Sequence, residues 1–239
     1  MCSPSLSWLY PWSQVMASTV HQQLSLVKCR VENSHQMPPI LEVMEYYTSK
    51  VNPFCPGMCD CYFHHFASTP ADLPSFTVLV NCSYQGLSTF PTVPPRTTVL
   101  DVSHNQIQSF YSLTPVTQNY QHISSLILSH NLLTTIDTKL LKLKLDRSFK
   151  ADHNAITEIP YDFSLLLQKY AKNEVFLGNN PWACSCNAEI TNLVSHLLLL
   201  RFYLTQAVFV QNLKMKVVDI EEVICDEGSF PQPIIGKKV

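Results

Sequence analysis

The sequence has few charged residues and very little glycine. Charged residues make up 14% of its 239 residues, the formal net charge is −2, and no basic run is longer than Lys237-Lys238. Electrostatic binding of nucleic acid requires a basic surface, so nucleic acid is excluded as an expected partner. The five glycines form no phosphate-binding loop, and the Gly-x-Ser-x-Gly, His-Glu-x-x-His and Cys-His settings of common enzymes are absent. We therefore expect no enzymatic activity, no cofactor and no catalytic metal.

A long uninterrupted hydrophobic run is also lacking. The most apolar stretch, residues 193–210, contains His196 and Arg201 near its centre, and a central arginine is costly in hydrocarbon. We interpret this stretch as a helix buried on one side rather than a membrane span. The first residues lack the basic and apolar regions of a signal peptide, and the last residues lack an anchor motif. Apolar residues nevertheless make up 46% of the chain, which is enough for a substantial core.

Cysteine is absent from the middle of the chain, between residues 82 and 184. The nine cysteines gather towards the two ends, at positions 2, 29, 55, 59, 61, 82, 184, 186 and 225. This clustering favours ends stapled by disulfides around a cysteine-free body, and hence an oxidising compartment. Because the number is odd, at least one cysteine has no partner within the chain.

The cysteine-free middle contains a repeat. Four stretches place apolar residues at alternating positions and an asparagine at the ninth: TTVLDVSHNQI (97–107), ISSLILSHNLL (123–133), DRSFKADHNAI (146–156) and KNEVFLGNNPW (172–182). The recurring asparagines are Asn105, Asn131, Asn154 and Asn180. Alternation predicts a short strand with one buried face, which must stack on its neighbours to bury that face. The asparagines are expected to satisfy backbone groups where the chain turns away from the sheet.

These stretches resemble the leucine-rich repeat pattern LxxLxLxxNxL. The departures are polar first positions at Thr97, Asp146 and Lys172 and a small Ala151. An irregular unit precedes them, since Val80, Cys82, Gln85 and Leu87 keep the spacing with glutamine in place of asparagine. The resemblance implies an α/β leucine-rich repeat solenoid, a horseshoe with a short parallel β-sheet. Its open ends would require caps.

The cysteine clusters resemble the caps of leucine-rich repeat proteins. Residues 55–82, CPGMCDCYFHH…VLVNC, resemble the N-terminal cap, which implies the pairs Cys55 with Cys61 and Cys59 with Cys82. NPWACSC (180–186) with the later Cys225 resembles the C-terminal cap, which implies the pair Cys184 with Cys225 and a lid formed by Trp182. A zinc site is the chemical alternative for the first cluster, because Cys55, Cys59, Cys61, His64 and His65 are ligand types at close spacing.

The stretch before residue 55 resembles the inner part of another C-terminal cap. We therefore expect four segments: a remnant of a preceding C-terminal cap (1–54), an N-terminal cap (55–95), repeats (96–180) and a truncated C-terminal cap (181–239). The partners of Cys2, Cys29 and Cys186 stay open, and we expect the chain to be a piece of a longer protein.

This order of caps resembles the membrane-proximal ectodomain of Toll receptors. The resemblance implies an extracellular protein-recognition module of a cell-surface receptor in innate immune or developmental signalling. Its partners would be a cystine-knot cytokine of the Spätzle type and a second receptor chain, with ligand-driven dimerisation as the mechanism. Contact with a membrane would come through the missing remainder of the parent receptor. The alternatives are a secreted binding protein, such as a decoy, a matrix module or a Slit-like guidance module, and a zinc-binding intracellular protein.

Two columns of side chains are candidate sites. Outward-facing strand residues form a mixed column suited to protein recognition, namely Asp101, Ile127, Lys150 and Phe176. Residues before the repeat asparagines form a second column, namely His104, His130 and His153. Neighbouring strands lie about 5 Å apart, so these imidazoles would repel one another when charged near pH 6, which suggests an acid-sensitive surface. Solvated faces are the simpler reading of both columns. Asn81-Cys82-Ser83 is a candidate glycosylation site.

Overall fold

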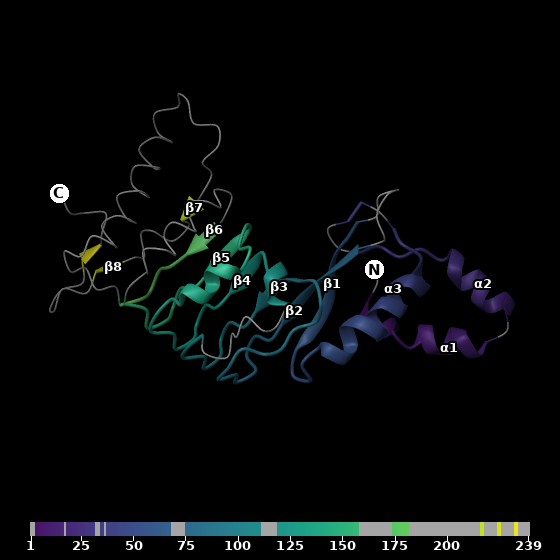
Figure 1. Ribbon diagram of the computed structural model, residues 1–239, viewed down its shortest axis with the longest axis horizontal. Coiled ribbons are helices and arrows are strands. Elements are labelled where there is room, and N and C mark those ends of the chain that lie inside the picture. Colours follow the sequence, from purple (N-terminus) through teal and green to yellow (C-terminus); the bar gives the residue numbers. More distant parts are fainter. Residues whose placement is uncertain are drawn as a thin grey trace, which may run out of the picture. The chain divides into compact units, whose positions relative to one another are not determined.

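The chain folds into two compact units. The computed structural model describes residues 3–16, 18–31, 34–35, 37–67, 75–110, 119–157 and 174–181, and three strand segments at 216–217, 224–225 and 232–233 (Figure 1). The first unit comprises residues 1–82, 91–101 and 117–123, and the second comprises 83–90, 102–116 and 124–239.

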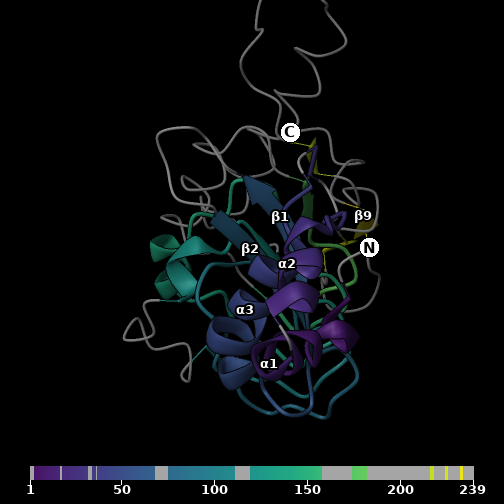
Figure 2. The same cartoon turned by 90° about the vertical axis from the view of Figure 1, so that its right-hand side faces the viewer.

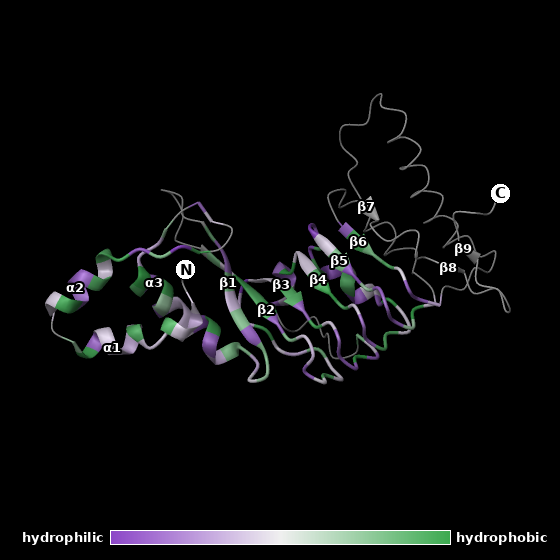
Figure 3. Ribbon diagram, turned by 180° about the vertical axis from the view of Figure 1, so that it is seen from behind, coloured by the Kyte–Doolittle hydropathy of each residue, from purple (hydrophilic) through white to green (hydrophobic). Residues whose placement is uncertain are grey.

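The first unit begins with helices. A 3-10 turn, Pro4–Leu6, precedes α1 (Leu9–Val15), α2 (Ser18–Leu26) and α3 (Ile40–Tyr46), and the three α-helices contact one another (Figure 2). Pro38 and Pro39 disfavour helical conformation in the residues that precede them, so α3 begins at Ile40. The spacing of the apolar residues from Ile40 onward gives α3 a buried face. A π-helical turn, Tyr47–Val51, and a 3-10 turn, Asn52–Phe54, continue the chain. In contrast, α2 carries a mixture of polar and apolar residues and buries none of them (Figure 3).

Three strands form the sheet of the first unit. β1 (Asp60–Ala67) pairs antiparallel with β2 (Ser75–Asn81), and β2 pairs parallel with β3 (Thr97–Asp101). The β1 register shifts between Phe63 and His65. Such a bulge adds one residue, which lets Phe63 and Phe66 face the same side although they are three residues apart. Both rings contact Phe76, at centroid distances of 5.3 and 4.8 Å, and together they form the aromatic core of this unit. A 3-10 turn, Tyr120–His122, completes the described elements of the unit.

Two disulfides close the β1–β2 region. Cys55 is bonded to Cys61 and Cys59 to Cys82, with Cα atoms 6.1 and 4.5 Å apart. These are the two pairs that the cap resemblance implies. Cys29 is buried and also disulfide-bonded. Because Cys55, Cys59 and Cys61 are all oxidised, none of them offers the thiolate that the alternative zinc site requires.

The second unit contains a parallel sheet of short strands. β4 (Ser125–Ile127), β5 (Ser148–Lys150), β6 (Glu174–Phe176) and β7 (Lys216–Val217) pair in that order and all run parallel (Figure 1). A 3-10 turn, Thr138–Lys142, connects β4 to β5, and β8 (Ile224–Cys225) pairs antiparallel with β9 (Gln232–Pro233). The central residue of three successive strands points into the core and is fully buried, namely Leu126, Phe149 and Val175. This arrangement confirms the prediction of a leucine-rich repeat solenoid with a parallel sheet.

The recurring asparagines form a hydrogen-bonded ladder beyond the strands. Asn131 donates from Nδ2 to the carbonyl oxygens of Val102 and Leu128, at 2.9 and 3.0 Å, and its Oδ1 accepts from the backbone N–H of Ile107 at 3.0 Å. Asn154 and Asn180 make the corresponding bonds one and two repeats further on. Each of these asparagines therefore satisfies backbone groups of its own turn and of the preceding one.

The first asparagine of the ladder has a different neighbour. Asn105 Oδ1 accepts from the backbone N–H groups of Gln85 and Leu87, at 3.0 and 2.9 Å. Gln85 stands where a repeat would carry asparagine. The irregular preceding unit therefore has no asparagine of its own, but its backbone N–H groups still donate to the side chain of Asn105. The ladder thus extends over one turn that lacks the repeat asparagine.

Candidate functional site

A column of stacked rings runs along the turns of the second unit. The rings of Tyr84, His104, His130 and His153 follow one another at centroid distances of 4.1 Å, with interplanar angles of 8°, 13° and 20°. One ring comes from each turn, so the regular spacing of the repeats sets the spacing of the rings. This ring column contains the three histidines of the predicted second column, and Tyr84 extends it by one turn.

The backbone holds these residues in an uncommon conformation. All of them have positive φ angles, 60° for Tyr84, 55° for His104, 56° for His130 and 53° for His153, and Asn179 in the next turn has 52°. Histidine and asparagine tolerate this left-handed region better than most residues do. The backbone N–H of each histidine also donates to a backbone carbonyl of the following turn: His104 to Ser129 at 2.9 Å, His130 to Asp152 at 3.1 Å and His153 to Gly178 at 3.0 Å. The conformation is therefore locked by the neighbouring repeat.

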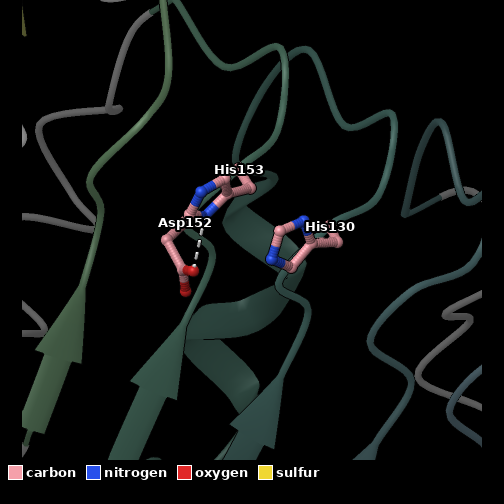
Figure 4. Close-up of side chains that lie close together, drawn as sticks. All are labelled: His130, Asp152 and His153. Carbon is pink, nitrogen blue, oxygen red and sulfur yellow. Dashed lines mark hydrogen bonds and ion pairs between the residues drawn. The ribbon is translucent and has the colours of Figure 1, made fainter.

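A carboxylate lies beside the last two rings of the column. Asp152 accepts a hydrogen bond from Ser129 Oγ at 2.5 Å through Oδ1, and its Oδ2 lies 2.9 Å from Nδ1 of His153. Ligand-type atoms of His130, Asp152 and His153 all lie within 4.8 Å of one another. Figure 4 shows a ring nitrogen of His130 turned towards the Asp152 carboxylate. His130 and His153 are exposed and Asp152 is half-buried, so the group is open to solvent.

The surroundings shift two of these titrating groups. Burial lowers the pKa of His130, and the imidazoles of His153 and His104 lower it further, while Asp152 acts in the opposite direction. For Asp152, burial acts to raise the pKa of the carboxyl. Its hydrogen bonds with Ser129, His153 and its own backbone, together with the His153 charge, outweigh that effect and hold the pKa below its ordinary value. The carboxylate is therefore kept ionised beside the histidines.

The predicted strand column divides between the two units. Ile127, Lys150 and Phe176 are register partners on β4, β5 and β6, and all three are half-buried. Nζ of Lys150 lies 4.7 Å from the ring centroid of Phe176, a cation–π contact. Asp101, the remaining member, ends β3 in the first unit, where it is the register partner of Asn81.

Other predicted site residues are placed as follows. Asn81 is the last residue of β2 and is half-buried, and its register partners are Asp60 and Asp101. Cys225 ends β8, whereas Cys184, Cys186 and Cys2 lie outside the described residues, as do Trp182 and the apolar stretch 193–210. In the described part of the chain, every helix is too short or too polar to cross a bilayer.

Sequence reasoning missed three members of the ring and carboxylate group. Tyr84 precedes Gln85 as each histidine precedes its asparagine, so the irregular unit already carried the signal. Asp152 and Ser129 occupy the position before the histidine, where the successive repeats carry Ser103, Ser129, Asp152 and Gly178. Reading that third column would have placed a carboxylate next to His153.

The comparisons with known proteins point to one fold. No family model matches the chain. The chain is 26% identical over 140 residues to Protein halfway of Drosophila pseudoobscura pseudoobscura, a match covering 56% of this chain and 23% of that protein. It is 30% identical over 138 residues to leucine-rich repeat-containing protein 3B of Danio rerio, covering 55% of this chain and 47% of that protein. The match thus spans less than half the length of either relative.

A solved structure agrees with these relatives. The Toll–Spatzle complex, described as a molecular hub in Drosophila development and innate immunity, contains a chain that matches with a TM-score of 0.53 and 23% identity. The match covers 77% of this chain and 21% of that one. The repeats, the asparagine ladder and the two disulfides already define the architecture. The chain therefore has a leucine-rich repeat fold, similar to part of the Toll chain in that complex.

Proposed function

We propose that the chain is an extracellular protein-recognition module, part of a Toll-like receptor of innate immune or developmental signalling. The observation that carries this proposal is the row of half-buried side chains across β4, β5 and β6, namely Ile127, Lys150 and Phe176. An aliphatic group, a cation and an aromatic ring in strict register offer a contact surface of the mixed character found at protein interfaces. Aromatic anchors are also common among the residues that dominate binding energy.

The disulfides support the extracellular part of the proposal. Cys55–Cys61 and Cys59–Cys82 are of the kind that persists in oxidising compartments and is rare in the cytosol. Within the proposal, the chain consists of a preceding C-terminal cap (1–54), an N-terminal cap (55–95), the repeats (96–180) and a further C-terminal cap (181–239). The disulfide-bonded Cys29 beside three packed helices supports the first of these assignments. Within the N-terminal cap, Asn81 is the proposed glycosylation site.

The partner is proposed from the structural similarity to the Toll chain. We propose a cystine-knot cytokine of the Spätzle type as the ligand. We propose a second receptor chain as the partner with which this chain dimerises when the ligand binds. The solved Toll complex contains Spatzle, which supports the choice of ligand class. The proposed activity is binding, with no catalytic step.

Surface plasmon resonance with the immobilised chain and a Spätzle-type cytokine tests this proposal. The test variant combines Ile127→Lys, Lys150→Ser and Phe176→Ser, all in the second unit, which leaves the net charge unchanged. We expect it to weaken binding by about tenfold or more, because the few residues that dominate an interface cluster at its centre, where truncating one costs about 2 kcal/mol or more.

The control variant changes four exposed residues in the turns of the same repeats, namely Gln106→Glu, Leu132→Ser, Thr134→Lys and Thr157→Ser. It also preserves the net charge, and its binding should stay within about twofold of the unchanged chain. Equal binding by both variants would refute the strand column as the binding surface. No binding of the unchanged chain would refute a Spätzle-type cytokine as its ligand.

A further inference from the structure

We infer that His130, Asp152 and His153 form a surface binding site for a divalent transition-metal ion such as Zn²⁺. This site lies on the turns of the second unit, and it does not depend on the proposed recognition role. The inference rests on two imidazoles and one carboxylate whose ligand atoms all lie within 4.8 Å of one another (Figure 4).

The donor types select the class of ion. Two imidazole nitrogens and one carboxylate oxygen suit Zn²⁺, Cu²⁺ and Ni²⁺, whereas Ca²⁺ and Mg²⁺ prefer oxygen ligands alone. Zinc binds nitrogen and oxygen ligands at about 2.0–2.2 Å, so its ligand atoms lie roughly 3–3.5 Å apart. Nδ1 of His153 and Oδ2 of Asp152 already lie 2.9 Å apart, so it is the His130 ring that must move closer to them to share an ion. Three protein ligands leave the fourth position of a tetrahedral ion to water.

The stacked rings define the motion that binding requires. The ring centroids of His130 and His153 are 4.1 Å apart and the rings are only 20° from parallel, so their nitrogen lone pairs lie in nearly parallel planes and do not converge on one point. At least one ring must turn about χ2 before both can address a single ion. That torsion is broad for histidine, and both rings are exposed. The turn replaces a ring contact and the His153–Asp152 hydrogen bond with bonds to the metal.

The surroundings keep the other parts of the site in place. The backbone N–H groups of His130 and His153 donate to the following turn, at 3.1 and 3.0 Å, so both Cα positions are fixed. Ser129 donates to Oδ1 of Asp152, which leaves Oδ2, now the partner of His153, as the oxygen available to an ion. An outer hydrogen bond of this kind orients a metal ligand and makes it more effective.

The repeats themselves provide a matched control. His104 occupies the same position as His130 and His153, has the same backbone conformation and stacks on His130 at 4.1 Å. The residue before His104 is Ser103, however, so its turn carries no carboxylate where the third repeat carries Asp152. The site is therefore specific to one end of the ring column, and His104 should be dispensable for it.

The test is a calorimetric titration of the full chain with ZnCl₂ after accessible thiols have been alkylated. We expect one saturable Zn²⁺ site, and we expect His130→Ala and Asp152→Asn each to weaken it by about tenfold or more. His104→Ala should stay within about twofold of the unchanged chain, since it removes no ligand. Substituting Co²⁺ should give ligand-field bands without a thiolate charge-transfer band, which separates this site from residual cysteines.

Circular dichroism of each variant checks that the fold is retained, and imidazole NMR signals provide a second measurement. Zn²⁺ should shift the signals of His130 and His153 more than that of His104. The inference is overturned if the alkylated chain shows no saturable binding. It is equally overturned if folded His104→Ala loses affinity as strongly as His130→Ala, because the ring stack rather than the carboxylate-bearing end would then hold the ion.

Discussion

Covalent bonds close the turns of the first unit, whereas asparagine side chains close those of the second. In the first unit, Cys59–Cys82 ties the loop before β1 to the end of β2. In the second unit, Asn131 makes two hydrogen bonds to the preceding turn and one to Leu128 in its own turn. A disulfide acts mainly by restricting the unfolded chain, while a buried amide acts by satisfying backbone groups that would otherwise lose their partners. The two units should therefore differ in how much stability they lose when the disulfides are reduced and when the asparagines are replaced.

Both units also depend on buried aromatic side chains, and the largest expected effect comes from removing one. Phe149, the central residue of β5, is fully buried. Phe149→Ala should lower the free energy of unfolding by about 4 kcal/mol, from lost burial and the cavity left behind. Chemical denaturation followed by circular dichroism measures this loss. Phe54→Ala in the first unit is the control, because that ring is 49% exposed. Similar losses for the two would mean that Phe149 does not lie in a closed core.

Disulfide removal should distinguish the first unit from the second. The double variant Cys59→Ala with Cys82→Ala opens a link between residues 23 apart in sequence. Loop-closure entropy predicts a loss of about 3 kcal/mol. Opening Cys55–Cys61, with a separation of 6, should cost about 2 kcal/mol.

Hydrogen exchange monitored by mass spectrometry locates these losses. Faster exchange should appear in β1 and β2, while the amides of the asparagine ladder should keep their protection. Greater loss of protection in β4–β6 than in β1 and β2 would contradict the distinction between covalent and hydrogen-bonded closure.

Substitutions in the ladder should show a graded effect. Asn131 is buried, whereas Asn154 makes the same kinds of bond but is only half-buried. Asn131→Ala should cost about 2–3 kcal/mol, because three backbone groups lose a partner away from water. Asn154→Ala should cost about 1 kcal/mol less, since water can reach the groups it leaves. Urea denaturation of both variants measures the difference, and a larger loss for Asn154→Ala would show that burial does not set the strength of the ladder.

The repeat sequence predicted the second unit better than the first. Strand positions, the asparagine ladder and the histidine column all follow from a period, and Leu126, Phe149 and Val175 are buried where alternation requires. The bulge at Phe63/His65 in β1 has no periodic signal, because it depends on how two non-repeating strands pair. The Asp152 contact with His153 was also missed, because the carboxylate replaces serine in a single repeat. Repetition makes a position predictable, and the departures from it carry the local chemistry.

The smallest expected effect concerns the protonation of the ring column in metal-free buffer. Burial, with His153 and His104 nearby, lowers the pKa of His130 in the folded state. The unfolded chain then binds the proton more readily, so the His130 contribution to stability is present above about pH 6.5 and is lost as pH falls through the folded pKa. In an NMR titration, His104→Ala should raise the His130 pKa by removing one positive neighbour. Asp152→Asn should lower it by removing the carboxylate that favours the charged form. A His130 pKa above its ordinary value, or a shift in the same direction in both variants, would show that the stacked neighbours do not control its charge.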